Sequence, residues 1–274
     1  MLKVPRVVYC ASLCRLIQDW LDGKVGSGAP TDSREIAQIR ALNNKTGEIG
    51  RLMNGLDESL VKSTYDKLVQ LDVTGSLKIA TSHRRWIVRC YDFLTLAGVE
   101  TSSELKDAVF FHDMSKYSHD EALGYAVMFG NGQPLRTLEG EEYAEWQLAL
   151  NHHYKYNHHH PEFFVSTGPG GCPCKSSMVG PAGENERFDH VHESIIDMLA
   201  VQGERLQTND DVISVKKMFT MEERYFDRYT DCDRVLVKEN MAAWENTVRE
   251  FLSVDENVEK VNGWFDDRRV VYES

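Results

Sequence analysis

Histidines are concentrated in one short segment of this sequence. Five of its ten histidines lie between residues 152 and 160. Burying five imidazoles without polar partners costs too much free energy for all of them to be ordinary core residues. Histidine is also the commonest metal ligand near neutral pH. The segment therefore indicates metal chemistry.

Four other side chains suit a single metal ion. His83 stands alone, His112 and Asp113 are adjacent, and Asp197 follows much later in the chain. Divalent ions bind imidazole nitrogens and carboxylate oxygens. Adjacent residues can both reach one ion only from a helix end or a distorted turn, whereas the other two can come from separate helices. We therefore predict that His83, His112, Asp113 and Asp197 bind one divalent ion and leave positions open for water and substrate.

The histidine segment predicts a second ion. His152 and His159 are seven residues apart, as are His153 and His160. This spacing is close to two helical turns, so either pair could face one point, although Pro161 indicates that the helix ends nearby. We favour His153 and His159 as ligands, because His153 continues an apolar stripe. The sequence does not distinguish among Mn, Fe, Mg, Zn, Co and Ni.

Polar residues near these positions are candidates for catalysis. Lys116, His152 and His160 could position a phosphate group or protonate a leaving oxygen. Lys116 is equally well explained as a lysine exposed to solvent. Glu193 is either an acceptor that orients a ligand histidine or an exposed glutamate.

The helix that carries His83 is predicted over residues 82–97. His83, Ile87 and Leu94 follow one another at spacings of four and seven, so they share one face. Gly98 then ends the helix. His83 is therefore expected to face the protein interior.

A second predicted helix leads to His112. Thr101 and Glu104 suit a capping box at its start. Leu105 and His112 are seven residues apart and lie on the same face. The His-Asp pair is therefore expected at the end of a helix.

Most of the remaining chain is also predicted to be helical. Ser118 and Glu121 suit another capping box, and Tyr143 and Trp146 are interpreted as core residues on the stripe that His153 continues. The other predicted helices cover residues 35–71, 119–129, 139–157, 190–205, 211–230 and 236–253. The sequence therefore predicts an all-α fold.

Only short segments depart from this pattern. Residues 6–9 and 269–272 alternate like strands, and residues 165–187 are rich in Gly, Pro and Ser. A loop of this length suits a lid over a site. We expect an N-terminal extension and linker (1–34), a helical metal-binding domain (35–205, core 80–205) and a C-terminal helical extension (206–274).

Composition limits the partners. With 31 basic and 43 acidic residues, the net charge is −12, which argues against long nucleic acid and favours a small anion held by a metal. Arg84, Arg85 and Arg89 are interpreted as the solvent side of a helix. No apolar run approaches the ~20 residues of a membrane span. The six cysteines are irregularly spaced, which suggests reduced thiols and a cytoplasmic protein; the basic N-terminus offers a mitochondrial presequence as the alternative.

The His-Asp segment resembles a known superfamily. The stretch FFHDMSK at 110–116, with His83 before it and Asp197 after it, is similar to the motif of the HD superfamily of metal-dependent phosphohydrolases. The resemblance covers about residues 80–205. It implies an HD-type helical bundle with additional N- and C-terminal helices. In two-metal branches of the superfamily, the residue matching Asp113 bridges both ions.

A closer resemblance is to an uncharacterised HD-like family of phages, bacteria and some animals. It rests on FHDMSKYSHDEALGYAVMF (111–129), LNHHYKYNHHHPEFF (150–164) and HESIIDMLA (192–200). The chain has His158 where that family often has proline, which leaves His159 and His160 as the matching pair. This resemblance implies the fold and the ligands but no substrate.

Three functions are compatible with these features. The first is hydrolysis of a phosphate ester, in a small nucleotide or phosphorylated metabolite, by a metal-activated water. The second is oxidation at a di-iron centre, as in HD-fold proteins of the myo-inositol oxygenase type. The third is a non-enzymatic binding module stabilised by metal. Metal identity and tests for turnover distinguish the three.

Overall fold

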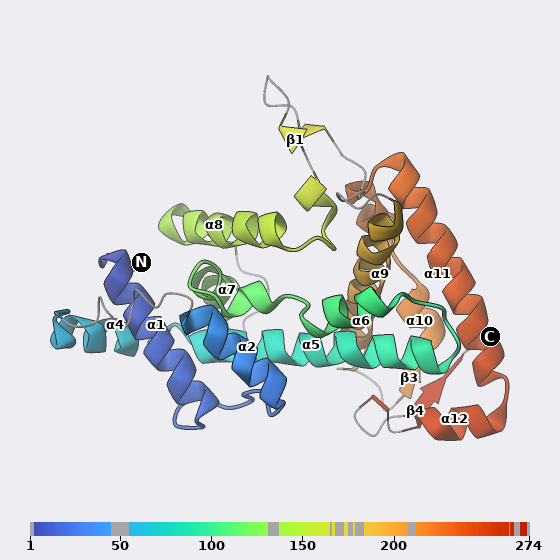
Figure 1. The fold of residues 1–274 in the computed structure, drawn as a ribbon, viewed down its shortest axis with the longest axis horizontal. Helices are drawn as coiled ribbons and strands as arrows, with labels where there is room; N and C mark the ends of the chain where they lie inside the picture. The colour runs from blue at the N-terminus through green and yellow to red at the C-terminus, as the bar shows by residue number, and fades with distance from the viewer. Residues whose placement is uncertain are drawn as a thin grey trace. The chain divides into compact units, whose positions relative to one another are not determined.

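The chain folds as an all-α protein, as predicted (Figure 1). The computed structural model describes residues 3–44, 55–130, 137–164, 166–167, 173–174, 178, 184–207, 212–262, 264–265 and 269–272. Among these residues, no helix is both long enough and apolar enough to cross a membrane.

The chain forms two compact units, each built from two segments. The first unit comprises residues 1–82 and 113–156, and the second comprises residues 83–112 and 157–274. The helix α5 (Val73–Leu96) passes from the first into the second after Ser82. The division expected from the sequence, into an N-terminal extension (1–34), a metal-binding domain (35–205) and a C-terminal extension (206–274), stays a prediction.

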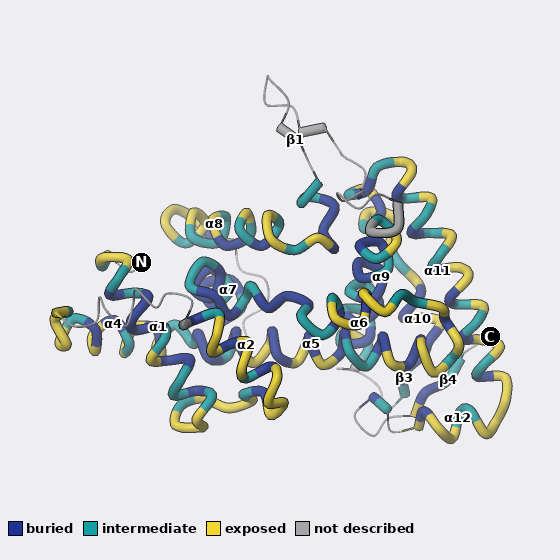
Figure 2. Tube along the Cα trace, in the orientation of Figure 1, coloured by how far each residue is buried: buried dark blue, intermediate teal, exposed yellow. Residues whose placement is uncertain are grey.

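The first unit consists of helices packed in pairs. Besides the start of α5, it contains α1 (Arg6–Leu21), α2 (Ser33–Asn44), α4 (Glu58–Gln70), the 3-10 helix η1 (Met114–Tyr117), α7 (Ala122–Phe129) and α8 (Gly140–Tyr156). The helix α1 packs along α4, and α7 packs along α8 (Figure 1). A Cβ at Gly124 would lie 2.3 Å from the Cβ of Ala149, so glycine allows α7 and α8 to approach closely. Buried residues follow the inner sides of these helices (Figure 2).

The second unit is built around one long helix. Its elements are the end of α5, α6 (Ser103–Phe110), η3 (Pro161–Phe164), β1 (Ser166–Thr167), β2 (Pro173–Cys174), α9 (Glu184–Gln207), β3 (Val212–Ser214), α10 (Val215–Phe219), η4 (Glu223–Arg228), α11 (Asp231–Leu252), α12 (Asp255–Val261) and β4 (Arg269–Val271). Val191, Ile195 and Leu199 recur every four residues on α9 and are fully or almost fully buried. The helix therefore presents an apolar side, and it packs against α6, α10 and α11.

Several predicted boundaries differ from the structure. The helix α5 begins at Val73 rather than at residue 82, because buried Leu77 and Ala80 extend its apolar side toward the N-terminus. The helix α9 likewise begins at Glu184 rather than at residue 190. The strand predicted at residues 6–9 is wrong, since these residues belong to α1.

The C-terminal region contains a short parallel strand pair that the helical prediction for 211–230 missed. Val212 pairs with Arg269 and Ser214 pairs with Val271. The strand predicted at residues 269–272 is confirmed as β4. The predicted helix is wrong over β3 because pairing with a distant strand overrides local helical propensity.

Both predicted capping boxes are wrong. The helix α6 is capped by Ser102, whose Oγ accepts a hydrogen bond from the Leu105 N–H at 3.1 Å. Glu121 stands at the N-terminus of α7 without a side-chain cap. Its carboxylate is hydrogen-bonded to His152 and His153 instead.

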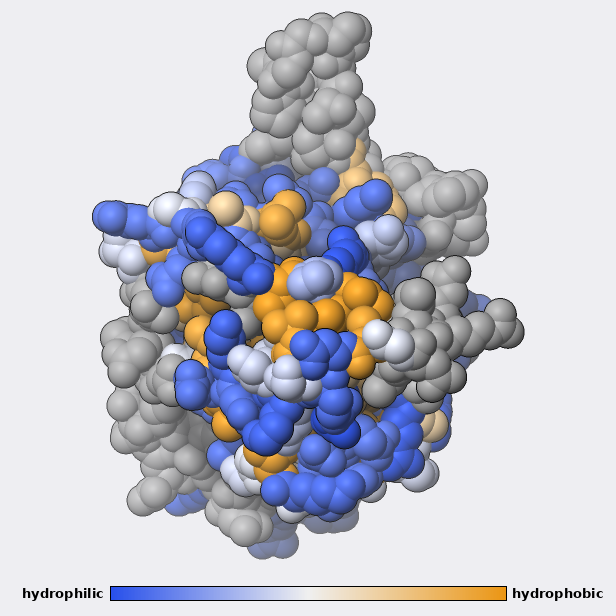
Figure 3. Space-filling view, turned by 90° about the vertical axis from the view of Figure 1, so that its left-hand side faces the viewer, coloured by the Kyte–Doolittle hydropathy of each residue, from blue (hydrophilic) through white to orange (hydrophobic). Residues whose placement is uncertain are grey.

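The predicted stripe of α8 is only partly correct. The side chain of Tyr143 is 52% exposed, so its assignment to the core is wrong. Trp146 is half-buried against Tyr125 and Phe129 of α7, and His153 is buried as predicted. On the face that Figure 3 presents, hydrophobic residues gather in a central patch, with smaller hydrophobic areas around it.

Candidate metal centre

The second unit brings together two histidines and an aspartate from three elements. His83 lies on α5, His112 lies in the turn after α6, and Asp197 lies on α9. His83 Nε2 is 3.1 Å from Asp197 Oδ1, and His112 Nε2 is 3.8 Å from the same oxygen. One ligand atom from each residue lies within 4.8 Å of the other two. We call His83, His112 and Asp197 the candidate metal centre.

Two glutamates hold the other nitrogens of these imidazoles. Glu204 Oε2 lies 3.0 Å from His83 Nδ1, and Glu193 Oε1 lies 2.9 Å from His112 Nδ1. A carboxylate only accepts, so each Nδ1 donates, and Nε2 is the atom of each ring that can bind a metal ion once it has no proton. That is the arrangement that orients histidine ligands in metal sites.

The interpretation of Glu193 as exposed is wrong, and Glu204 was missed altogether. Glu193 is only 7% exposed. A sequence signal for both existed: Glu193, Asp197 and Glu204 are four and seven residues apart, so they follow one side of α9.

His159 adjoins this centre. Its Nδ1 lies 3.3 Å from Glu193 Oε1, and its ring centroid is 4.1 Å from that of His112. His112, His159 and Glu193 form a second group of donor atoms within 4.8 Å of one another. His160 follows, with its ring centroid 4.1 Å from that of His159.

The electrostatics favour ionised carboxylates in this cluster. Burial raises the pKa of Glu193, but the charge of His159 and hydrogen bonds from His112 and His159 outweigh burial and lower it to about 2. Burial likewise raises the pKa of Asp197, whereas the hydrogen bond from His83 and the charges of the nearby imidazoles hold it well below its ordinary value. Both acids are therefore negative near neutral pH.

The turn that carries His112 is fixed by an arginine of α5. Arg84 Nε donates to the His112 carbonyl at 2.7 Å, and its Nη2 donates to the Phe110 carbonyl. Arg84 is 4% exposed, so its predicted place on the solvent side is wrong, although Arg85 is exposed as expected. The next residue, Asp113, has a left-handed backbone with φ 55°, which aspartate tolerates better than most residues.

A glycine allows α9 to pass close to α5. A Cβ at Gly203 would lie 2.5 Å from Cζ3 of Trp86, a distance that real side chains do not adopt. Trp86 is one helical turn from His83, and Gly203 immediately precedes Glu204. The close approach therefore helps Glu204 to reach His83.

The donor atoms fit a divalent metal ion. Two imidazole nitrogens and a carboxylate oxygen form a ligand set that zinc, iron and manganese accept. The buried His, Asp and Glu groups of this unit could therefore hold a metal ion.

Comparison with known proteins places the chain in a family. Residues 75–250 match a family of unknown function, DUF5662. The chain belongs to this family. No curated protein and no solved structure matches it. The part that matches DUF5662 contains every residue of the candidate metal centre, together with Glu193 and Glu204.

The DUF5662 segment also contributes a buried polar cluster to the first unit. His153 Nε2 lies 3.3 Å from Asp113 Oδ1, and His153 Nδ1 lies 2.9 Å from Glu121 Oε2. Lys116 Nζ lies 2.5 Å from Asp113 Oδ2. Burial is the main cause that raises the pKa of Glu121, to about 8. Asp113 was predicted to bind the first ion with His83, and His153 to bind the second ion with His159. Both stay predictions, because Asp113 and His153 belong to the first unit and their predicted partners to the second.

The other candidates for catalysis have definite partners. His152 Nδ1 lies 2.7 Å from Glu121 Oε1, and its Nε2 lies 3.6 Å from Asp120 Oδ2. Lys116 forms an ion pair with Asp113 and lies over the ring of Tyr125. It is therefore not the exposed lysine of the alternative interpretation. The predicted lid at 165–187 lies almost wholly outside the described residues; within it, the buried Met178 N–H donates to Asp233 Oδ2 at 3.1 Å.

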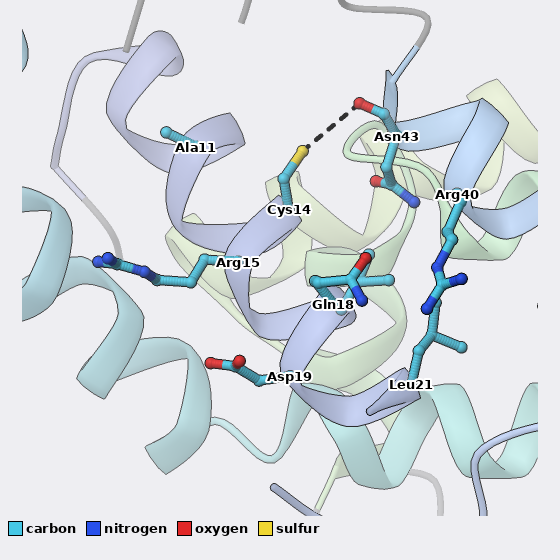
Figure 4. A pocket seen from close by; sticks show the side chains of 9 residues that line it. Ala11, Cys14, Arg15, Gln18, Asp19, Leu21, Arg40 and Asn43 are labelled. Carbon is cyan, nitrogen blue, oxygen red and sulfur yellow. Dashed lines mark hydrogen bonds between the residues drawn. The ribbon is translucent and has the colours of Figure 1, made fainter. Parts of the chain in front are cut away.

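A pocket of about 300 Å³ lies between α1 and α2, outside the DUF5662 match (Figure 4). Its two arginines are paired with acids: Arg15 with Glu58 at 2.7 Å and Arg40 with Asp22 at 3.3 Å. No histidine lines the described wall of this pocket. It therefore lacks the donors found around His83.

Proposed function

We propose that this protein hydrolyses a phosphate ester of a small metabolite in a metal-dependent reaction. One observation carries the proposal: Nε2 of both His83 and His112 faces Asp197 Oδ1 while a glutamate holds Nδ1 of each ring. This arrangement is typical of metal sites rather than of ordinary core histidines. The resemblance of FFHDMSK to the HD superfamily supports the reaction class.

The protein's own residues have defined tasks in this proposal. Asp197 stays ionised, because the imidazoles beside it lower its pKa. Glu193 and Glu204 keep the proton of each ring on Nδ1. A divalent ion bound by His83, His112 and Asp197 would polarise a phosphoryl oxygen and lower the pKa of a water molecule.

The net charge supports a metal-dependent mechanism for an anionic substrate. A chain with a charge of −12 repels phosphate esters over most of its surface. A divalent cation supplies concentrated positive charge at one point. The cluster around His83 is therefore a suitable place for a phosphate group on an acidic protein.

The test is a screen for turnover by the purified full chain. The protein is loaded separately with Mn²⁺, Fe²⁺, Zn²⁺ and Mg²⁺ and assayed with p-nitrophenyl phosphate, bis(p-nitrophenyl) phosphate and a panel of nucleotides. We expect hydrolysis with at least one metal and its loss in Asp197→Asn. Glu239→Gln, which changes an exposed acid on α11, should keep full activity.

Two results would overturn the proposal. Metal-loaded protein that hydrolyses no phosphate ester but consumes oxygen with a di-iron centre would favour an oxygenase. Metal-loaded protein without either activity would favour a binding module stabilised by metal.

A further inference from the structure

Four imidazoles of the second unit form a row. The ring centroids of His83 and His112 are 5.6 Å apart, those of His112 and His159 are 4.1 Å apart, and those of His159 and His160 are 4.1 Å apart. The first three rings each have a glutamate oxygen within 3.3 Å of Nδ1. The last ring has a different partner at that atom.

Nδ1 of His160 faces an arginine. Arg228, at the end of η4, places Nη2 3.0 Å from His160 Nδ1. The same guanidinium donates to both oxygens of Glu162, at 2.9 Å and 2.6 Å. This two-point contact fixes the plane of the guanidinium, so its direction toward His160 is set by η3 and η4 together.

The chemistry of the partner determines where each ring carries its proton. A guanidinium has five N–H donors and no acceptor, so His160 Nδ1 accepts and its proton lies on Nε2. The glutamates accept from Nδ1 of His83 and His112, so Nε2 is the atom of these rings that can bind a metal ion. The row therefore contains two kinds of ring: rings whose Nδ1 donates to a glutamate, and one ring whose Nδ1 accepts from an arginine.

We propose that His160 is not a metal ligand but a neutral hydrogen-bond donor to an oxyanion, and that Arg228 is the positioning residue that makes it one. A ring with Nε2–H has no lone pair to offer a metal from that atom. Beside three rings with carboxylate partners at Nδ1, such an N–H suits a non-bridging oxygen of a phosphate group. The choice of phosphate as the oxyanion rests on the proposed function; the assignment of the proton does not.

The first test is the tautomer of His160 in the full chain without metal. Histidine rings are labelled with ¹⁵N, and two-bond ¹H–¹⁵N correlation spectra distinguish Nδ1–H from Nε2–H. The His160 signals are those that disappear in His160→Gln. We expect Nε2–H in the natural protein and a shift toward Nδ1–H in Arg228→Met.

Two matched variants sharpen this test. Arg228→Lys keeps a donor and should keep the Nε2–H form, whereas Arg224→Met, which changes an exposed arginine of η4, should have no effect. A His160 ring with Nδ1–H in the natural protein, or one unchanged in Arg228→Met, would overturn the proposal. The natural protein alone provides this answer if a variant fails to fold.

The second test measures binding of Zn²⁺ and of inorganic phosphate. Chelator competition should give His160→Gln a Zn²⁺ affinity within about three-fold of the natural protein, against a loss of more than about 100-fold in His83→Gln. An equal loss in both variants would contradict the proposal.

Phosphate binding to the Zn²⁺-loaded protein should weaken about ten-fold in His160→Gln, the effect of one lost hydrogen bond. No phosphate binding by the natural protein, or no change in the variant, would overturn the assigned ligand. If the enzyme screen fails while the tautomer and Zn²⁺ results hold, the proposed reaction is wrong and the role of Arg228 stands.

Discussion

At the scale of single residues, the candidate metal centre depends on the partners of each imidazole as much as on the imidazoles. Glu204 and Glu193 hold His83 and His112 from the side opposite Asp197. A carboxylate at Nδ1 fixes the ring orientation and makes Nε2 more basic. These two glutamates should therefore control metal affinity without binding the ion themselves.

Replacing either glutamate tests this expectation. Glu204→Gln and Glu193→Gln should each weaken Zn²⁺ binding by about 10- to 100-fold, measured by chelator competition. The exposed Glu239→Gln serves as a matched control and should leave the affinity unchanged. Equal affinities in all three variants would show that the imidazoles need no carboxylate partner.

The low pKa of Glu193 predicts a pH-dependent stability of the metal-free protein. Its folded pKa of about 2 is below the ordinary value of about 4.3. The unfolded state therefore binds more protons between these values, so stability is complete above the ordinary pKa and is lost as the pH falls toward 2. The loss should be on the order of 3 kcal/mol.

Denaturant unfolding between pH 6 and pH 2 measures this loss. Glu193→Gln should show a smaller decrease than the natural protein, and Glu239→Gln should show the same decrease. An identical pH dependence in the natural protein and Glu193→Gln would contradict the assigned charge state.

Residue types and order predict part of this site. His83, His112 and Asp197 could be proposed because imidazole and carboxylate groups in this order suit a metal. Arg228 could not be connected with His160, because the two are 68 positions apart and no periodicity relates residues on different elements. Glu204 shares a helix with Asp197, so its spacing was a usable signal.

At the scale of elements, Arg84 of α5 holds the end of α6. Arg84 donates to the carbonyls of Phe110 and His112, at a helix end, where backbone carbonyls need donors from outside the helix. A buried carbonyl that loses its donor costs about 1–3 kcal/mol. The position of His112 therefore depends on α5 as well as on α6.

Neighbouring arginines of α5 provide a matched comparison. Arg84→Met should lower the free energy of unfolding by about 3 kcal/mol, whereas the exposed Arg85→Met should change it by less than about 0.5 kcal/mol. Denaturant unfolding measures both. If Arg84→Met is as stable as Arg85→Met, the arginine does not hold the turn.

The contact between α5 and α9 requires a glycine at position 203. Gly203→Ala would place a Cβ 2.5 Å from Trp86, so the helices or the indole must move. We expect a loss of about 1–3 kcal/mol in unfolding free energy, together with weaker Zn²⁺ binding. Gly98→Ala is the control for replacing a glycine. Gly98 has a positive φ and open space around it, so this variant should be less stable but, once folded, should bind Zn²⁺ with unchanged affinity. Equal Zn²⁺ affinity in both variants would show that Gly203 does not affect the metal centre.

Helical periodicity predicted most of the long helices but not their ends. The apolar spacing in α5, α8, α9 and α11 extends over several turns, so local sequence is sufficient to identify them. The strand β3 has three residues and pairs with β4 near the C-terminus. Such a pair is determined by long-range contacts, which local patterns do not contain.

At the scale of the whole molecule, an acidic chain gathers a small number of histidines into an ordered cluster. Because the net charge is −12, a bound cation would offset the negative charge of the carboxylates around His83 and His112. Metal binding should therefore stabilise the folded chain, because the unfolded chain cannot bring donors from α5, α9 and the turn after α6 together.

The most direct measurement is the metal content and Zn²⁺ affinity of the purified full chain. Elemental analysis should find bound metal in the natural protein and in Glu239→Gln. His83→Gln, His112→Gln and Asp197→Asn should each lose it while keeping a helical circular dichroism spectrum. Full metal content in all three variants would contradict the proposed centre.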